Sequence, residues 1–189
     1  PEKTRLSSQA PANTPPKKTA YRYRDENGVE RWRVVRYDWP GCVDETTGKP
    51  KKTFNVGRVV DKELVKGLNG EKVPPYNLPE LLDKTRRIVC VVEGEKCAVA
   101  LRFLFKQVGF DKFAVATTLP NGAKSAQRWS EYVDLLRDKE RVFVFADNDA
   151  PGRKAARTIA KILTDAGIGA TVKVIGEGAF EGNPYLQTV

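Results

Sequence analysis

From residue 86 onwards, short apolar runs alternate with segments of helical spacing, and this alternation constrains the fold more than any other feature. The first run, residues 87–92 (R-I-V-C-V-V), is continuous, which is typical of a strand buried on both faces of a parallel sheet. The expected strands are residues 87–92, 113–117, 142–146 and 170–175, and the expected helices are residues 95–108, 125–136 and 151–166. This order predicts an α/β fold in which helices flank a parallel sheet.

The chain ahead of this pattern has a different character. Tyr21-Arg22-Tyr23-Arg24 alternates aromatic and basic residues, Asn27-Gly28 is a turn signal, and strands are expected at residues 29–37 and 51–60. We therefore expect a smaller, basic, β-rich, nucleic-acid-binding segment over residues 20–85. Residues 1–19 contain four prolines and little apolar bulk, so they are interpreted as a flexible tail or linker, and residues 177–189 as a C-terminal tail.

The net charge is concentrated in this β-rich half. The chain has 33 Lys and Arg against 24 Asp and Glu, and its first 88 residues hold 19 of the former and 12 of the latter. A basic excess favours a polyanionic partner, because basic side chains can follow phosphates while aromatic rings stack on bases. The candidates are Arg22, Arg24, Arg36, Lys51 and Lys52. A plain sheet core is the alternative for the aromatic residues; it is favoured for Trp32 and Tyr37 and stays open for Tyr21 and Tyr23.

The composition excludes several classes of function. The chain has no histidine and no C-x-x-C pair, which argues against a zinc site and removes every histidine-based catalytic triad. Its three cysteines are scattered and odd in number, so we expect a reducing compartment and a cytoplasmic protein. No apolar run reaches 18 residues, so no membrane association is expected.

Acidic residues follow two of the expected strands. Glu93 comes directly after the first strand, and Asp147 and Asp149 come after the third. Because ligands of an open parallel sheet bind beyond the carboxyl ends of its strands, these carboxylates are the candidate catalytic and metal-binding residues. Oxygen ligands favour Mg²⁺ or Mn²⁺ over zinc. Taken alone, Asp-x-Asp before a helix is more often a turn with an N-cap, and the combination with Glu93 favours the functional interpretation.

The same edge offers candidate phosphate-binding residues. They are Lys96, Asn121, Gly122, Lys124 and Arg128, all in the segments that follow the first two strands. Each of the three basic side chains, Lys96, Lys124 and Arg128, could equally be an ordinary surface charge. Cys90 and Cys97 are expected to fill the core.

Three motifs together resemble the Toprim domain of bacterial, phage and plasmid primases and primase-helicases. They are Val92-Glu93-Gly94-Glu95-Lys96, Thr118-Leu119-Pro120-Asn121-Gly122-Ala123 and Phe145-Ala146-Asp147-Asn148-Asp149-Ala150-Pro151-Gly152. The resemblance covers residues 86–176 and implies that Glu93 is a metal ligand or general acid/base and that Asp147 and Asp149 bind metal. It also implies a nucleotidyltransferase that makes short primers from nucleoside triphosphates on single-stranded DNA during replication, with a replicative helicase as a partner.

Two other functions remain open at this point. One is phosphodiester cleavage at the same acidic residues, and the other is a non-catalytic nucleic-acid-binding or replication-interaction module with a vestigial site. Cys97 stands where many of these primases have an acid, which favours the second alternative. The length suits one such domain with its preceding basic segment, which is less than a complete primase.

Overall fold

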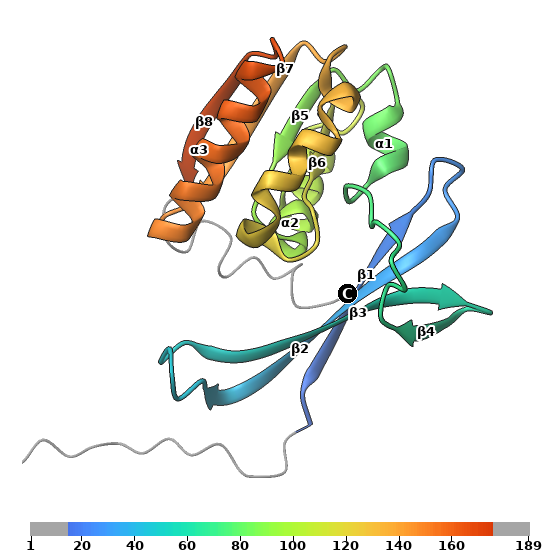
Figure 1. The fold of residues 1–189 in the computed structure, drawn as a ribbon, viewed down its shortest axis with the longest axis vertical. Helices are drawn as coiled ribbons and strands as arrows, with labels where there is room; N and C mark the ends of the chain where they lie inside the picture. Colours follow the sequence, from blue (N-terminus) through green and yellow to red (C-terminus); the bar gives the residue numbers. More distant parts are fainter. Residues whose placement is uncertain (1–14, 176–189) are drawn as a thin grey trace, which may run out of the picture.

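The computed structural model describes residues 15–175 and divides them between two sheets (Figure 1). The first is antiparallel, in the order β1 (Lys17–Arg24), β2 (Glu30–Val43), β3 (Pro50–Val60) and β4 (Glu63–Lys66). The second is parallel, in the order β6 (Ala114–Thr117), β5 (Ile88–Val91), β7 (Arg141–Asp147) and β8 (Ala170–Ile175). The helices are α1 (Leu78–Leu82), α2 (Glu95–Gln107) and α3 (Ala150–Asp165), with the 3₁₀ helices η1 (Gly122–Glu131) and η2 (Val133–Leu136). The predicted α/β class is therefore confirmed.

Two strands of the antiparallel sheet differ from the expected division of the chain. Strand β1 begins at Lys17, inside the segment 1–19 that was expected to be a tail, because its first residues pair with β2. The short strand β4 was not expected either, and it pairs with the end of β3. Residues 1–14 and the expected C-terminal tail, residues 177–189, lie outside the described residues.

The segment 125–136, expected to be one α-helix, forms two 3₁₀ helices instead. The chain enters η1 through Asn121 in a left-handed conformation, and the Ser125 hydroxyl donates to the Pro120 carbonyl. Tyr132 then interrupts the helix with a φ of −127°. The apolar spacing of Trp129, Val133 and Leu136 fits either helix type, so periodicity alone could not distinguish them. Within residues 15–175, no helix is long and apolar enough to cross a bilayer.

Both faces of strands β5, β6 and β7 are covered, which explains why these strands are continuous apolar runs. On one face, Val89, Val91 and Val144 pack with Trp129 of η1 and with α3. On the other, the strand residues Cys90 and Ala116, with Val92 just after β5, pack with α2 and with the tyrosines of β1. Burial raises the pKa of Cys90 to about 12, as expected for a core thiol.

The two sheets are joined through a buried tyrosine cluster. Tyr21 and Tyr23 of β1 are buried, and both rings lie edge-on to Tyr76, with ring centroids 6.4 and 5.1 Å away. The Tyr23 hydroxyl donates to Glu95 Oε1 at 2.7 Å, in the first turn of α2. The question left open by the sequence is therefore settled: Tyr21 and Tyr23 belong to the core.

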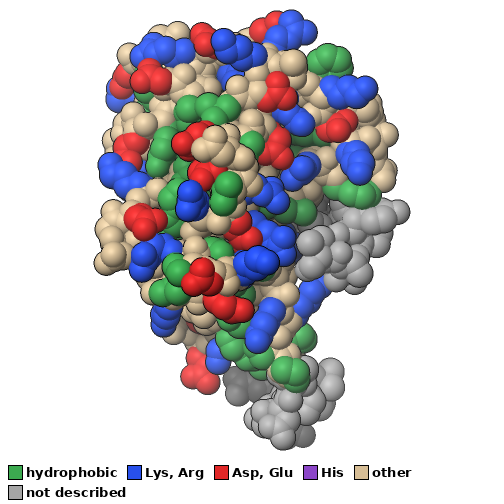
Figure 2. All heavy atoms as spheres, turned by 90° about the vertical axis from the view of Figure 1, so that its right-hand side faces the viewer, with side chains coloured by type: hydrophobic (Ala, Val, Ile, Leu, Met, Phe, Trp, Pro, Cys, Tyr) green, Lys and Arg blue, Asp and Glu red, His purple; other side chains and the backbone are tan. Residues whose placement is uncertain are grey.

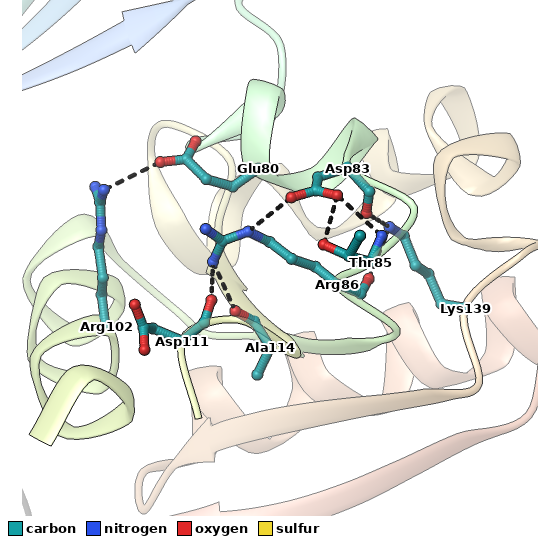
Figure 3. Close-up of polar contacts among 8 residues, drawn as sticks. All are labelled: Glu80, Asp83, Thr85, Arg86, Arg102, Asp111, Ala114 and Lys139. Atoms are coloured by element: carbon teal, nitrogen blue, oxygen red, sulfur yellow. Dashed lines mark hydrogen bonds and ion pairs between the residues drawn. The ribbon is translucent and has the colours of Figure 1, made fainter. Parts of the chain in front are cut away.

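The amino end of the parallel sheet is closed by polar contacts within the protein (Figure 3). Lys139 Nζ donates to the carbonyls of Asp83 and Arg86, at 3.1 and 2.9 Å. The Arg86 guanidinium in turn donates to the carbonyls of Asp111 and Ala114. These bonds tie together the loops that precede β5, β6 and β7. The carboxyl end faces the antiparallel sheet instead, with the long β2–β3 hairpin beneath it (Figure 1).

Candidate active site at the carboxyl edge of the parallel sheet

The fold brings the three predicted acidic residues to one edge. Strands β5 and β7 are direct neighbours, so Glu93, which follows β5, and Asp147, which ends β7, leave the sheet side by side. Asp149 follows two residues later as the N-cap of α3. The pairing of two parallel strands thus brings Glu93 close to aspartates that are far from it in the sequence.

Glu93 shows the strongest electrostatic signature of this edge. Burial, and then the negative charges of Asp147 and Asp149, raise the pKa of Glu93 to about 7, against an ordinary value of 4.5. Its Oε2 atom is buried and has no hydrogen-bond partner among the described residues. A buried carboxylate oxygen without a donor is costly, so this environment favours the neutral, protonated form of Glu93.

Two glycines allow the chain to approach Glu93 closely. A Cβ atom at Gly152 would lie 2.8 Å from the Asp147 carbonyl oxygen and 2.9 Å from Glu93 Oε2, closer than real Cβ contacts. A Cβ atom at Gly122 would lie 3.0 Å from the Glu93 carbonyl oxygen, and the φ of Gly122 is +54°. Thr118 Oγ1 also donates to that carbonyl, at 3.0 Å. The loop after β6 and the start of α3 therefore enclose Glu93 from two sides.

Asp149 serves the helix as well as the edge. Its Oδ1 atom accepts from the Gly152 amide at 2.8 Å, so the N-cap interpretation of Asp-x-Asp is correct for this residue. Its Oδ2 atom lies 3.7 Å from Lys49 Nζ. One oxygen of Asp149 thus fixes the first turn of α3, while the other faces the β2–β3 hairpin.

Two lysines of the hairpin approach the acidic residues. Besides Lys49, the positive charge of Lys52 lies close enough to Glu93 to act against the rise in its pKa. Lys52 was a predicted phosphate-binding residue, whereas Lys49 was missed as a site residue. The sequence carries no local signal for the Lys49–Asp149 contact, because it depends on how the two sheets pack.

The other residues predicted at this edge differ in whether their side chains are exposed or are bonded within the protein. Lys96, Asn121 and Lys124 are exposed and stand on segments that start at the carboxyl ends of β5 and β6. Arg128 is half-buried; its Nη2 atom donates to the Val73 carbonyl and the Tyr132 hydroxyl, both at 3.2 Å. Arg128 therefore holds the connector ahead of α1, and its guanidinium is used within the protein.

The basic residues predicted on the β-rich segment do not form one strip. Strand alternation places Arg22, Arg24 and Lys51 on the face away from the parallel sheet and Arg36 and Lys52 on the face toward it. Arg36 binds Asp38 through both Nε and Nη2, and Arg22 lies 3.7 Å from Glu30. Figure 2 shows basic and acidic side chains interspersed over the face that it presents. The net charge is thus distributed and partly paired.

The carboxylate oxygens at this edge are of the type that binds a hard divalent cation, but they do not form a complete metal site. Among residues 15–175, no group of three or more Asp, Glu or Cys side chains is already arranged to hold a metal ion. The unpartnered Glu93 Oε2 beside Asp147, with the outer oxygen of Asp149, supplies carboxylate oxygens of the kind that Mg²⁺ and Mn²⁺ prefer. Cys97 lies close by, and burial followed by Asp147 and Glu93 raises the pKa of its thiol to about 11, so it contributes no charge.

Among solved structures, this chain is similar in fold to parts of DNA primases. The primase fragment of the bacteriophage T7 primase-helicase protein matches with a TM-score of 0.58 and 19% sequence identity, over 90% of this chain and 60% of that one. A DNA primase domain from Pseudomonas aeruginosa matches with a TM-score of 0.49 and 22% identity, over 85% of this chain and 44% of that one. This chain thus spans less than two thirds of either. No protein-family model and no curated protein matches the sequence. The T7 likeness shows that the two-sheet arrangement is the fold of a primase fragment.

Proposed function

We propose that the chain is the catalytic part of a DNA primase-type nucleotidyltransferase with a Toprim site. It uses Mg²⁺ or Mn²⁺ to synthesise short primers from nucleoside triphosphates on single-stranded DNA. The fold shared with the T7 primase fragment supports the class of protein, and the motifs around Glu93, Asp147 and Asp149 support the site.

The observation that carries the proposal is the buried, unpartnered oxygen of Glu93 next to two aspartates. Three carboxylates in one place repel one another, which is why burial and proximity raise the pKa of Glu93 to about 7. A protein gains nothing in stability from such an arrangement unless a cation or a proton relieves it. This is the arrangement expected of a functional site.

The residues then take distinct roles. Glu93, Asp147 and the outer oxygen of Asp149 hold the cation, and Gly152 keeps the space beside them open. When bound, the cation supplies Lewis-acid chemistry for phosphoryl transfer and neutralises charge on the triphosphate. Lys49 and Lys52 cover the site from the hairpin, and Lys96, Asn121, Gly122 and Lys124 border it, so all six can bind phosphate.

The name of the T7 protein joins a primase to a helicase. We propose on this basis that the complete protein also works with a replicative helicase. Nucleoside triphosphates and single-stranded DNA remain the partners of the chain itself.

Primer synthesis tests the proposal directly. The chain is incubated with single-stranded DNA, labelled nucleoside triphosphates and Mg²⁺ or Mn²⁺, and short products are resolved on a gel. We expect Asp147→Asn to lower product formation by about a hundredfold or more, since it removes a charged ligand. The matched control is Asp134→Asn, an exposed aspartate of η2 that pairs with Arg137. Equal product from wild type and Asp147→Asn would refute the proposal.

The same samples distinguish the alternative functions. Nicking of DNA without nucleotides would indicate a Toprim nuclease. Binding of single-stranded DNA that is indifferent to metal and to Glu93→Gln, with no product, would indicate a binding module. The Lys49–Asp149 ion pair and the neutral Cys97 favour that module over the nuclease, because both reduce the negative charge available to a cation.

A further inference from the structure

The antiparallel sheet has an inner and an outer face, and only the inner one packs against the parallel sheet. Alternation along β1 and β2 turns Tyr21, Tyr23 and Val34 inward to the shared core. Residues of opposite parity, including Tyr37 and Trp39 on β2, therefore stand on the outer face. The sequence favoured a core role for Tyr37, but the structure places it outside that core.

Tyr37 and Trp39 form a half-exposed aromatic pair near the hairpin end. Their ring centroids lie 6.3 Å apart, and the ring planes are inclined by only 32°. They are two residues apart on one strand, which gives a spacing of about 6.8 Å along the sheet. Asn55 Nδ2 lies 3.5 Å from the Tyr37 hydroxyl, on the neighbouring strand. The two rings are therefore held at a spacing that successive bases of an extended single strand can match.

A lysine from each neighbouring strand lies over one of these rings. Lys18 Nζ of β1 is 5.7 Å from the Tyr37 centroid, and Lys51 Nζ of β3 is 5.6 Å from the Trp39 centroid. Both lysines are exposed, and within residues 15–175 neither has a carboxylate in salt-bridge range. Asp44 of the same loop accepts hydrogen bonds from the Thr47 and Thr46 amides, which lower its pKa, and the charge of Lys51 adds to this from beyond salt-bridge range. The patch is thus cationic and aromatic at once.

From this geometry we propose that the outer face of the β2–β3 hairpin is a stacking platform for single-stranded DNA. Two successive bases lie on Tyr37 and Trp39, while Lys18 and Lys51 move from the rings to the adjacent phosphates. Aromatic stacking with flanking cations is how single strands are bound without base-specific hydrogen bonds. The proposal rests on the proposed function for its choice of DNA as the ligand. It needs neither metal nor nucleotide, because this face points away from the carboxyl edge.

Binding without metal tests the platform. Labelled dT20 is titrated with the whole chain in EDTA, and fluorescence anisotropy gives the dissociation constant. We expect the double variant Tyr37→Ala/Trp39→Ala to bind about 25-fold or more weakly, since each stacked base contributes about fivefold or more. The matched control is Phe113→Ala, which removes another exposed ring at the amino end of the parallel sheet. Circular dichroism shows whether each variant is folded.

Two further variants keep the test decisive if the double variant unfolds. Trp39→Phe retains a ring, so its affinity should stay within about threefold, while the quenching of tryptophan fluorescence by dT20 should be reduced. Lys18→Ala/Lys51→Ala should lower the slope of log Kd against log salt by about 1.4, at roughly 0.7 per phosphate on a single strand.

The outcomes separate this proposal from the proposed function. Unchanged affinity in both double variants would overturn the platform, even if the chain makes primers, and would leave the face to a protein partner. Weaker binding in the double variants together with no primer synthesis by wild type would overturn the proposed function alone.

Discussion

The parallel and antiparallel sheets use their surfaces in opposite ways. The central strands β5 and β7 of the parallel sheet are covered on both faces, so their interiors are apolar and the acidic residues stand at the strand ends. In the antiparallel sheet, the inner face packs into the core near the tyrosine cluster and the outer face does not. The side chains that could bind a ligand therefore lie along the outer face of its strands. An edge site therefore depends on close backbone packing, whereas a face site depends on side chains that tolerate change.

Gly152→Ala should have the largest effect, because it acts on the packed edge. The added methyl group would lie 2.8 Å from the Asp147 carbonyl and 2.9 Å from Glu93 Oε2, so the acidic residues must move apart. We expect primer synthesis to fall about a hundredfold, since small displacements of reacting groups are expensive. The free energy of unfolding should fall by about 1–3 kcal/mol.

Gly169→Ala is the matched control for this variant. A Cβ atom at Gly169 meets nothing within 4 Å, so both activity and stability should be unchanged. If Gly152→Ala retains full activity, the close packing around Glu93 has no functional role.

Tyr23→Phe tests the joint between the sheets. It removes the hydroxyl that donates to the buried Glu95 and leaves that carboxylate short of a partner. We expect a loss of about 1–3 kcal/mol in the free energy of unfolding, measured in urea. Tyr37→Phe is the control on the outer face, where the hydroxyl has only a long contact to Asn55, and should cost under about 0.5 kcal/mol. Equal losses in the two variants would contradict the distinction between an inner and an outer face.

Glu93→Gln should make stability less dependent on pH. The folded-state pKa of Glu93 is raised to about 7 from 4.5, so the native state binds its proton more tightly than the unfolded state. The wild type is therefore favoured below pH 4.5 and loses this advantage as the pH rises through 7. The full shift corresponds to about 3 kcal/mol between pH 4.5 and 8.5. Because the half-buried carboxyl is screened by solvent, the variant should gain about 1–2 kcal/mol over wild type at pH 8.5, relative to their difference at pH 4.5.

Urea unfolding of both proteins at the two pH values, with and without Mg²⁺, measures this effect. Magnesium should stabilise wild type more than the variant at pH 8.5, because Glu93 is a proposed ligand. A constant stability difference across this range would show that the Glu93 carboxyl is not perturbed.

Lys49→Ala should have the smallest effect, since its contact with Asp149 is long and largely exposed. Stability should change by less than about 0.5 kcal/mol. Removing this competing charge should tighten Mg²⁺ binding, measured calorimetrically, by about twofold to threefold. Lys66→Ala on β4 is the control for the loss of one exposed lysine. Weaker metal binding in Lys49→Ala would mean that the lysine assists the cation rather than competing with it.

The parallel sheet could be predicted from the sequence because its signals are local. A buried strand such as residues 87–92 must be apolar on both faces, and the acids that follow β5 and β7 are fixed at the edge by topology. The type of helix over 125–136 was wrong, since hydrophobic spacing does not distinguish 3₁₀ from α geometry there.

The antiparallel sheet was predicted less well because alternation shows two faces but not which one is covered. Tyr21 and Tyr37 look alike in the sequence, and only the packing of β1 against Tyr76 and the parallel-sheet core makes the first a core residue. The Tyr23–Glu95 bond spans 72 residues, and the Lys49–Asp149 contact joins the two sheets. Neither contact has a signature that a single sequence could display.

The strand order of the parallel sheet also dictates when the acidic site can exist during synthesis. Strand β5 lies between β6 and β7, so the ribosome releases a central strand first and its second neighbour much later. The pair of β5 and β6 can form early, but Glu93 meets its aspartates only after β7 has emerged and docked. The three acidic residues of the carboxyl edge therefore come together only after most of the described chain has been made.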